Sequence, residues 1–196
     1  MTTSNTARSN VYDPAARHLH WTIFGFVAFL AALGLTMGDY PKAIQPFWIN
    51  IHVTVGLVFF LVVLARVAYR VTHKPPEFAD DVVGASRHLS HPVHMLMYAL
   101  LLIIPVLGIV ARVWHGRTFD FGLFALDFGV KQDKTIFHPA EDYHVYAVYL
   151  LLAFVAFHIC AALWHRFVKR DSVMGRMLPA LATPETEKAP AKVAAE

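Results

Sequence analysis

Four long apolar stretches, separated by polar connections of different lengths, dominate the pattern of the chain. They cover about 20–37, 47–65, 92–111 and 143–164. A helix needs about 20 predominantly apolar residues to cross the hydrocarbon core of a bilayer, which is about 30 Å thick. The pattern therefore predicts an all-α integral membrane protein, folded as one bundle of four spanning helices.

The polar positions outside these stretches set the domain boundaries. We expect a polar N-terminal segment at 1–16, the four-helix domain at 17–179 and a disordered tail at 180–196, which is rich in Ala, Pro, Glu and Lys. The connection at 112–142 is the longest. It mixes phenylalanines with acidic and basic residues, which indicates a segment lying on the bundle or in the membrane interface rather than a free loop.

Composition agrees with a membrane protein. Hydrophobic residues make up 57% of the chain, charged residues make up 16%, and the mean hydropathy is +0.47. The single cysteine, Cys160, cannot form an internal disulfide, an iron–sulfur site or the two-cysteine attachment of a covalent haem. A net charge of +3 is unremarkable. We therefore expect the bilayer as a partner and no nucleic acid.

Basic residues are unevenly distributed among the connections. Twelve of the 17 Lys and Arg residues lie in the N-terminal segment, the second connection and the C-terminal flank, and five lie in the first and third connections. Because positively charged residues are concentrated on the cytoplasmic side of membrane proteins, both termini are expected inside. The connection at 112–142 then faces outward.

Two histidines, His144 and His158, lie fourteen residues apart in the last apolar stretch. In a helix this is four turns less about 40°, so both rings leave the same face about 21 Å apart along the axis. One histidine then lies near each side of the membrane. Neutral imidazole is a good iron ligand, and the spacing therefore predicts two haems stacked across the bilayer.

Histidines of the other stretches lie at matching depths. With both termini inside, His52 is level with His144 near the outer face, and His20 is level with His158 near the inner face. Each pair can hold one iron from both sides, and such an iron has no open position, which favours electron transfer. His91 and His94 share the inner level, and from spacing alone His94 could replace His20.

The same repeat of fourteen residues leads from His20 to Gly34 and from His94 to Gly108. From His52 it leads to Arg66. A glycine at the level of a haem leaves room for a flat porphyrin, although small residues also serve ordinary helix packing. Arg66, at the end of a span, can pair with a haem propionate. It can equally be a charge that sets the topology.

A set of short motifs runs from about Arg17 to Pro179. They are His20-Trp21, Ile51-His52-Val53 with Arg66, His91 through His94, Pro105-Val106-Leu107-Gly108, Tyr143-His144, His158, His165 and Arg176-Met177-Leu178-Pro179. In this set the chain resembles the bacterial cytochrome b561 family, small four-helix cytochromes with two haems that include superoxide oxidase.

The resemblance implies that two haem b groups are bound without covalent links by His20, His52, His144 and His158. It thereby selects His20 over His94, and it implies that His94 and His91 lie beside a haem or its propionates. It further implies a multi-pass protein of the bacterial inner membrane that exchanges electrons with ubiquinone. Superoxide is oxidised on the outer side in the best-defined members of the family.

The leading hypothesis is therefore an oxidoreductase that oxidises superoxide to oxygen and reduces ubiquinone. Superoxide is an anion, and cations in the outer connections would raise its local concentration. Arg112 is the best candidate for this steering. It lies eighteen residues, or five full turns, after His94, so it points to the same side of the helix, toward the middle of the bundle, near the outer haem.

Two alternatives remain at this point. The protein could be an electron-carrier subunit that exchanges electrons between quinol and a periplasmic redox protein. It could also be a histidine-lined transporter or proton path without haem. Such a path would place histidines at closely spaced depths, whereas these histidines form two layers with an empty middle.

Overall fold

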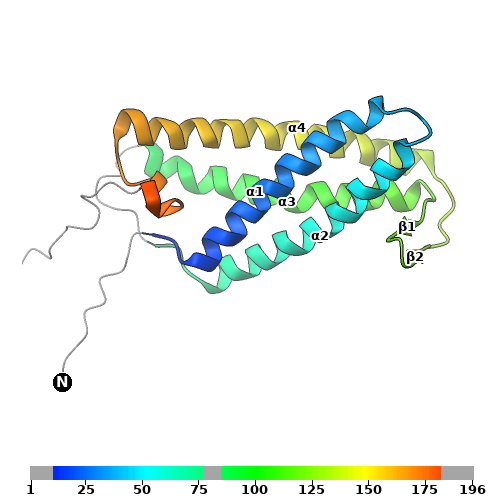
Figure 1. The fold of residues 1–196 in the computed structure, drawn as a ribbon, viewed down its shortest axis with the longest axis horizontal. Coiled ribbons are helices and arrows are strands. Elements are labelled where there is room, and N and C mark those ends of the chain that lie inside the picture. Colours follow the sequence, from blue (N-terminus) through cyan, green and yellow to red (C-terminus); the bar gives the residue numbers. More distant parts are fainter. Residues whose placement is uncertain (1–10, 77–84, 182–196) are drawn as a thin grey trace, which may run out of the picture.

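A computed structural model describes residues 11–76 and 85–181 of the chain. Its long elements are four helices, α1 (Pro14–Thr36), α2 (Gln45–Thr72), α3 (Ala85–Trp114) and α4 (Lys134–Trp164). They form an elongated bundle (Figure 1). All four are long and apolar enough to cross a membrane, which confirms the predicted four-helix membrane fold. The predicted tail lies outside the described residues from position 182 onward.

All four helices begin before their apolar stretches, and polar side chains cap two of these starts. Asp13 caps α1 by accepting a hydrogen bond from the Ala16 amide (2.9 Å), and it also accepts one from the Tyr69 hydroxyl of α2 (2.7 Å). Asp133 caps α4 through the hydroxyl and the amide of Thr135. These two hydrogen bonds lower the pKa of Asp133, so the cap stays ionised at neutral pH.

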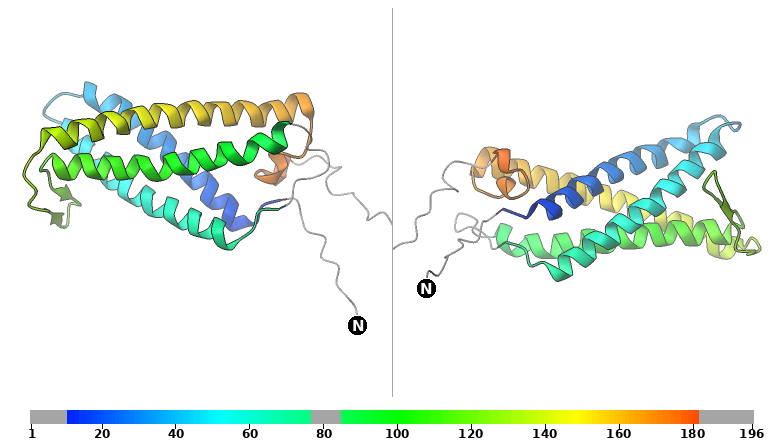
Figure 2. Two further views of the ribbon diagram at one scale, coloured as in Figure 1. Left: turned by 180° about the vertical axis from the view of Figure 1, so that it is seen from behind. Right: turned by 60° about the horizontal axis from the view of Figure 1, so that its bottom comes forward.

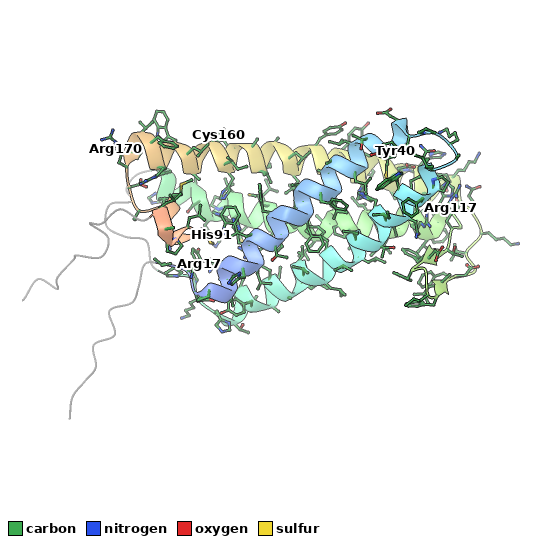
Figure 3. The ribbon with its side chains drawn as sticks, viewed as in Figure 1. Arg17, Tyr40, His91, Arg117, Cys160 and Arg170 are labelled. Carbon is green, nitrogen blue, oxygen red and sulfur yellow. The ribbon has the colours of Figure 1, made fainter. Side chains whose placement is uncertain are left out.

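The helices pack as two antiparallel pairs. The longest packed interface joins α3 to α4, and α1 packs mainly against α2. Figure 2 shows α3 and α4 side by side along most of the molecule, with α1 and α2 crossing them. Basic residues are found at both ends of the bundle. Arg17 and Arg170 lie at one end, with His91, and Arg117 lies at the other, with Tyr40 (Figure 3).

The apolar core fills the middle of the bundle. Leu151 lies halfway along α4 between His144 and His158 and is buried. It packs in a cluster with Ile23, Leu30, Phe59, Val63, Leu100, Leu101 and Ile104. The two histidine levels are thus separated by packed hydrocarbon. The outward faces of the helices are also apolar, with Leu61 65% exposed, and a lipid environment accounts for such a surface.

Short elements close the two ends. At one end, strands β1 (Phe119–Asp120) and β2 (Ala125–Leu126) form an antiparallel hairpin in the connection between α3 and α4. Because α4 begins at Lys134, this connection is shorter than the apolar pattern alone indicated. At the other end, α4 continues into a π-helical turn (His165–Lys169) and two short 3-10 turns (Met174–Arg176 and Pro179–Leu181).

Candidate functional site

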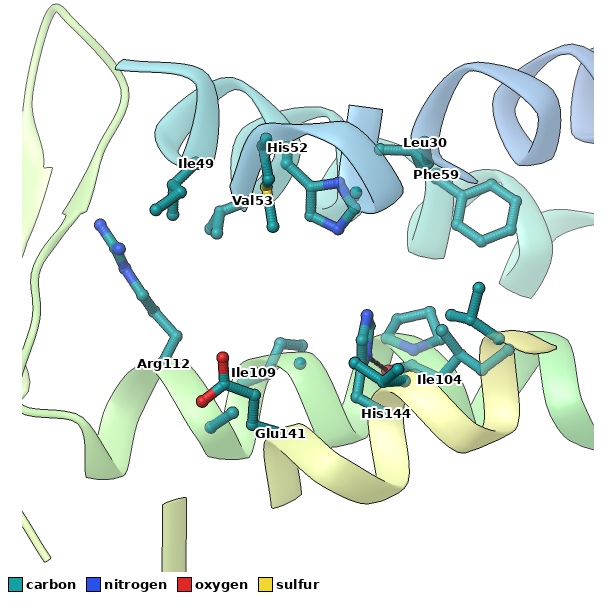
Figure 4. A pocket seen from close by; sticks show the side chains of 18 of the residues that line it. Leu30, Ile49, His52, Val53, Phe59, Ile104, Ile109, Arg112, Glu141 and His144 are labelled. Carbon is teal, nitrogen blue, oxygen red and sulfur yellow. Dashed lines mark hydrogen bonds between the residues drawn. The ribbon is translucent and has the colours of Figure 1, made fainter. Parts of the chain in front are cut away.

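The histidines of α2 and α4 meet near the end of the bundle that carries the hairpin. His52 and His144 point toward one another from opposite sides of a cavity (Figure 4). Their ring centres are 6.3 Å apart, and the ring planes are inclined at 77°. The cavity measures about 450 Å³ and is lined by residues from all four helices, a size typical of cofactor sites.

The second pair lies toward the opposite end. We call His52 and His144 the outer pair and His20 and His158 the inner pair, after the orientation expected from the sequence. The ring centres of His20, from α1, and His158, from α4, are also 6.3 Å apart, with planes inclined at 65°. The Trp21 ring contacts His20 edge to face at 5.3 Å. Both pairs suggested by matching depth are therefore brought together, each joining α4 to a different partner helix.

The separation of the rings can be tested against a shared metal ion. A metal–imidazole bond is about 2 Å long and the coordinating nitrogen lies about 1.1 Å from the centre of its ring, so two ligands on opposite sides of one metal have ring centres about 6 Å apart. Both pairs meet this requirement at 6.3 Å. Each pair could therefore hold one haem iron between its two rings, and such an iron would supply electron transfer.

His94 lies at the inner level but fits the ligand role less well. Its ring centre is 5.3 Å from that of His158, which is too short for two ligands on opposite sides of one metal. Its Nδ1 is hydrogen-bonded to the Ser90 carbonyl one turn earlier. The distances therefore favour His20 as the partner of His158, with His94 beside the pair. His91 is exposed, one turn before His94.

Backbone geometry fixes the outer histidines. The Nδ1 atom of His144 donates to the Ile104 carbonyl at 2.8 Å, so its Nε2 atom is left as the metal-binding nitrogen. One turn further along α3, a Cβ at Gly108 would lie 3.2 Å from the His144 ring. A Cβ at Gly34 of α1 would lie 3.0 Å from the His52 ring. Both glycines thus give space to a histidine ring.

His52 differs from His144 in one respect. Its Nδ1 atom is buried and has no hydrogen-bond partner among the described residues. A buried nitrogen of this kind is costly unless a partner bonds to it, so the observation is consistent with a ligand that enters the cavity and reaches this atom.

Arg66 lies at the inner pair. Its guanidinium donates to the Ala16 carbonyl at 2.9 Å, lies 3.5 Å from the His20 Nδ1 atom and stands over the Tyr98 ring. A cation held beside a candidate haem ligand is suitably placed for a propionate. The propionate role of Arg66 stays a prediction.

The mouth of the outer cavity is charged. Arg112 reaches into it (Figure 4) and donates twice to the Thr118 carbonyl, at 3.1 and 2.6 Å. Glu141 also lines the cavity, three residues before His144. Arg117 and His115 line both this cavity and an adjoining open groove of about 570 Å³, which also includes Lys131. The outer end is therefore rich in cations but also contains a carboxylate.

Two features of the site are not identified in the sequence analysis. Glu141 lies one helical turn from His144, and that spacing could have placed it on the same face. The role of the Ile104 carbonyl cannot be identified in the sequence, because every residue has a backbone carbonyl. Only the packing of α3 against α4 brings it to the histidine.

Comparison with known proteins gives a consistent result. The family model described as prokaryotic cytochrome b561 matches residues 11–180. The chain is 22% identical to "Cytochrome b561 homolog 1" of Escherichia coli K12, with 87% of this chain and 98% of that protein covered. It is 22% identical to "Probable superoxide oxidase CybB" of Yersinia pestis (82% and 92% covered) and 28% identical to "Cytochrome b562" of Cereibacter sphaeroides (82% and 90%).

Proposed function

The chain belongs to the prokaryotic cytochrome b561 family, and we propose that it takes electrons from superoxide and delivers them to ubiquinone. It is a membrane electron carrier of a b-type haem family. In the proposal, superoxide is met at the outer face of the bacterial inner membrane. Both termini lie in the cytoplasm in this proposal. The observation that carries it is the presence of two histidine pairs with metal-bridging separation at the two ends of α4. The haem-free transporter loses its support, because the family consists of cytochromes.

In this proposal, the chain holds two haems. His52 and His144 hold the outer one, and His20 and His158 hold the inner one. A haem with two histidine ligands gains and loses one electron without binding oxygen. The protein's own contribution is to fix the imidazole rings, to keep water out with the core around Leu151, and to place Arg66 beside the inner pair.

Superoxide is supported as the electron donor by the charges at the outer cavity. Arg112, Arg117 and Lys131 attract an anion toward the end of the bundle that holds His52 and His144. Two superoxide anions release two electrons and leave two molecules of oxygen. With two protons these electrons convert one ubiquinone to ubiquinol. One of the relatives is named as a probable superoxide oxidase.

Stopped-flow absorption of the purified oxidised protein tests this function. Mixing with superoxide should produce reduced b-haem bands within the dead time or shortly after it, and excess ubiquinone should return the bands to the oxidised form. Haem bands that stay oxidised with superoxide but are reduced by quinol would reject superoxide as the donor.

A second candidate is supported by Glu141. A carboxylate at the cavity mouth repels superoxide, but it can accept a proton from an uncharged quinol. The protein would then be an electron-carrier subunit that passes electrons from quinol to a periplasmic redox protein.

Opposite charge changes at the mouth distinguish the two candidates. If superoxide is steered to the outer cavity, Glu141→Gln should raise its second-order rate constant about threefold at low salt, and Arg112→Gln should lower it by a similar factor. Both effects should shrink at high ionic strength, because salt screens exposed charges. The measurement is the rate of haem reduction against salt concentration. If Glu141→Gln lowers the rate of quinol oxidation and leaves the rate with superoxide unchanged, the result would support the electron-carrier subunit.

A further inference from the structure

The hairpin between α3 and α4 presents apolar side chains outward. At its tip, Leu123 is 96% exposed and Phe124 is 58% exposed. Phe128, just after β2, is 61% exposed. The neighbouring Phe119 is instead buried and lines the outer cavity. A segment of this kind is unfavourable in water and suits an apolar or interfacial surrounding.

The hairpin is held against α2 within the predicted membrane span. The Asp120 carbonyl accepts hydrogen bonds from the Asn50 side-chain amide at 2.6 Å and from the Thr54 hydroxyl at 3.5 Å. These residues lie three and seven positions inside the apolar stretch that starts at Phe47, which corresponds to about 4 and 10 Å along the helix. The hairpin therefore folds back beside α2, as Figures 1 and 2 show. It lies at the level where the apolar stretch of α2 is expected to enter the bilayer.

Much of the backbone of the hairpin is hydrogen-bonded within the protein. The strands pair Phe119 with Leu126 and Asp120 with Ala125. The Phe121 amide donates to the Phe124 carbonyl, and the Gly122 amide donates to the Asp120 carboxylate. The Thr118 carbonyl is bonded by Arg112. Backbone groups need partners of this kind wherever water is scarce, as it is near the hydrocarbon boundary.

We infer that this hairpin, residues 118–129, is an interfacial anchor that inserts Leu123 and Phe124 into the outer leaflet of the membrane. Lipid is the partner that fits, because the hairpin that carries the apolar tip is hydrogen-bonded to α2, a predicted membrane span whose own flank exposes Val58 and Leu61. Phe and Leu side chains are typical of the apolar face of segments that lie in the membrane interface. The carboxylates of Asp120 and Asp127 are not free, because each accepts a hydrogen bond from a backbone amide two residues later.

The anchor is also connected to the outer histidine pair. Phe119 lines the cavity that contains His52 and His144, and the Arg112 side chain joins that cavity to the Thr118 carbonyl. A hairpin tip that is fixed in lipid therefore holds Phe119 at the wall of the outer cavity. This consequence does not depend on which electron donor the protein uses.

Spin-label accessibility tests the anchor directly. The full chain with Cys160→Ser, which removes the native thiol, carries one added cysteine for a nitroxide and is placed in phospholipid nanodiscs. The test position is Leu123→Cys. Leu61→Cys, on the exposed flank of α2, serves as the lipid reference, and Lys131→Cys, in the open groove, serves as the water reference.

At position 123 we expect the label to collide more often with oxygen than with a water-soluble nickel chelate, and position 61 should show the same order. At position 131 the nickel chelate should collide with the label more often than oxygen does. A label at position 123 that behaves like the one at position 131 would overturn the proposal. A label shielded from both reagents would also overturn it, because the tip would then contact protein. An unchanged haem spectrum in all three variants shows that the fold is intact.

Discussion

Replacing His144 with alanine is expected to remove one haem and leave the other. The His52 ring then has no partner across the cavity, and one imidazole with no second ligand holds a b-type haem weakly. The inner pair, about 21 Å away along α4, keeps both of its rings. Haem content per chain should fall by half, and electron transfer from the outer donor to ubiquinone should fall at least about a hundredfold.

The control for this change lies on the same helix. His138 is exposed, six residues before His144, and His138→Ala should keep both haems. At the inner level, His20→Ala should remove one haem and His94→Ala should keep it, because only His20 has the 6.3 Å separation from His158. The pyridine haemochrome assay counts the haems. A His144→Ala protein with full haem content would show that the ligand assignment is wrong.

The sequence predicts the positions of these rings well because a membrane helix has few degrees of freedom. The bilayer thickness fixes its length and the helical repeat fixes its faces. Two numbers, the depth and the rotation of each histidine, are therefore enough to pair His52 with His144. The predicted family is confirmed by the match of the family model to residues 11–180.

The remaining detail depends on packing, which the helical repeat does not determine. His20 and His94 share a depth, and only the crossing of α1 and α3 near α4 gives them different distances from His158. The start of α4 at Lys134 is set by the Asp133 cap rather than by hydrophobicity. The return of the hairpin to Asn50 depends on contacts between residues 70 positions apart, for which the apolar pattern contains no signal.

The glycines show the same division between pattern and packing. The repeat of fourteen places Gly34 at the outer level, and two uses were open there, space for a porphyrin or close helix packing. In the structure, the space beside Gly34 is taken by the His52 ring, with its Cε1 atom 3.0 Å from the position of a Cβ. Gly108 has the same relation to His144. The two glycines therefore make room for the histidine rings.

Gly34→Val is accordingly expected to empty the outer haem site. Even a single Cβ at 3.0 Å forces the His52 ring to move, and two further methyl groups enlarge the overlap, which typically costs about 1–3 kcal/mol in a packed interior. A shift of the ring away from His144 breaks the 6.3 Å separation. Haem content should fall toward one haem per chain, while the inner haem keeps its spectrum.

Gly25→Val is the matched control, because Gly25 lies on the same helix and a Cβ there meets nothing within 4 Å. Both variants replace a helical glycine with the same residue, so their effects on helix formation are comparable. Any difference in haem content then comes from the contact with His52. Equal haem content in the two variants would mean that the outer histidine tolerates a displaced ring. The position of His52 would then be set by the metal it binds rather than by the helix opposite.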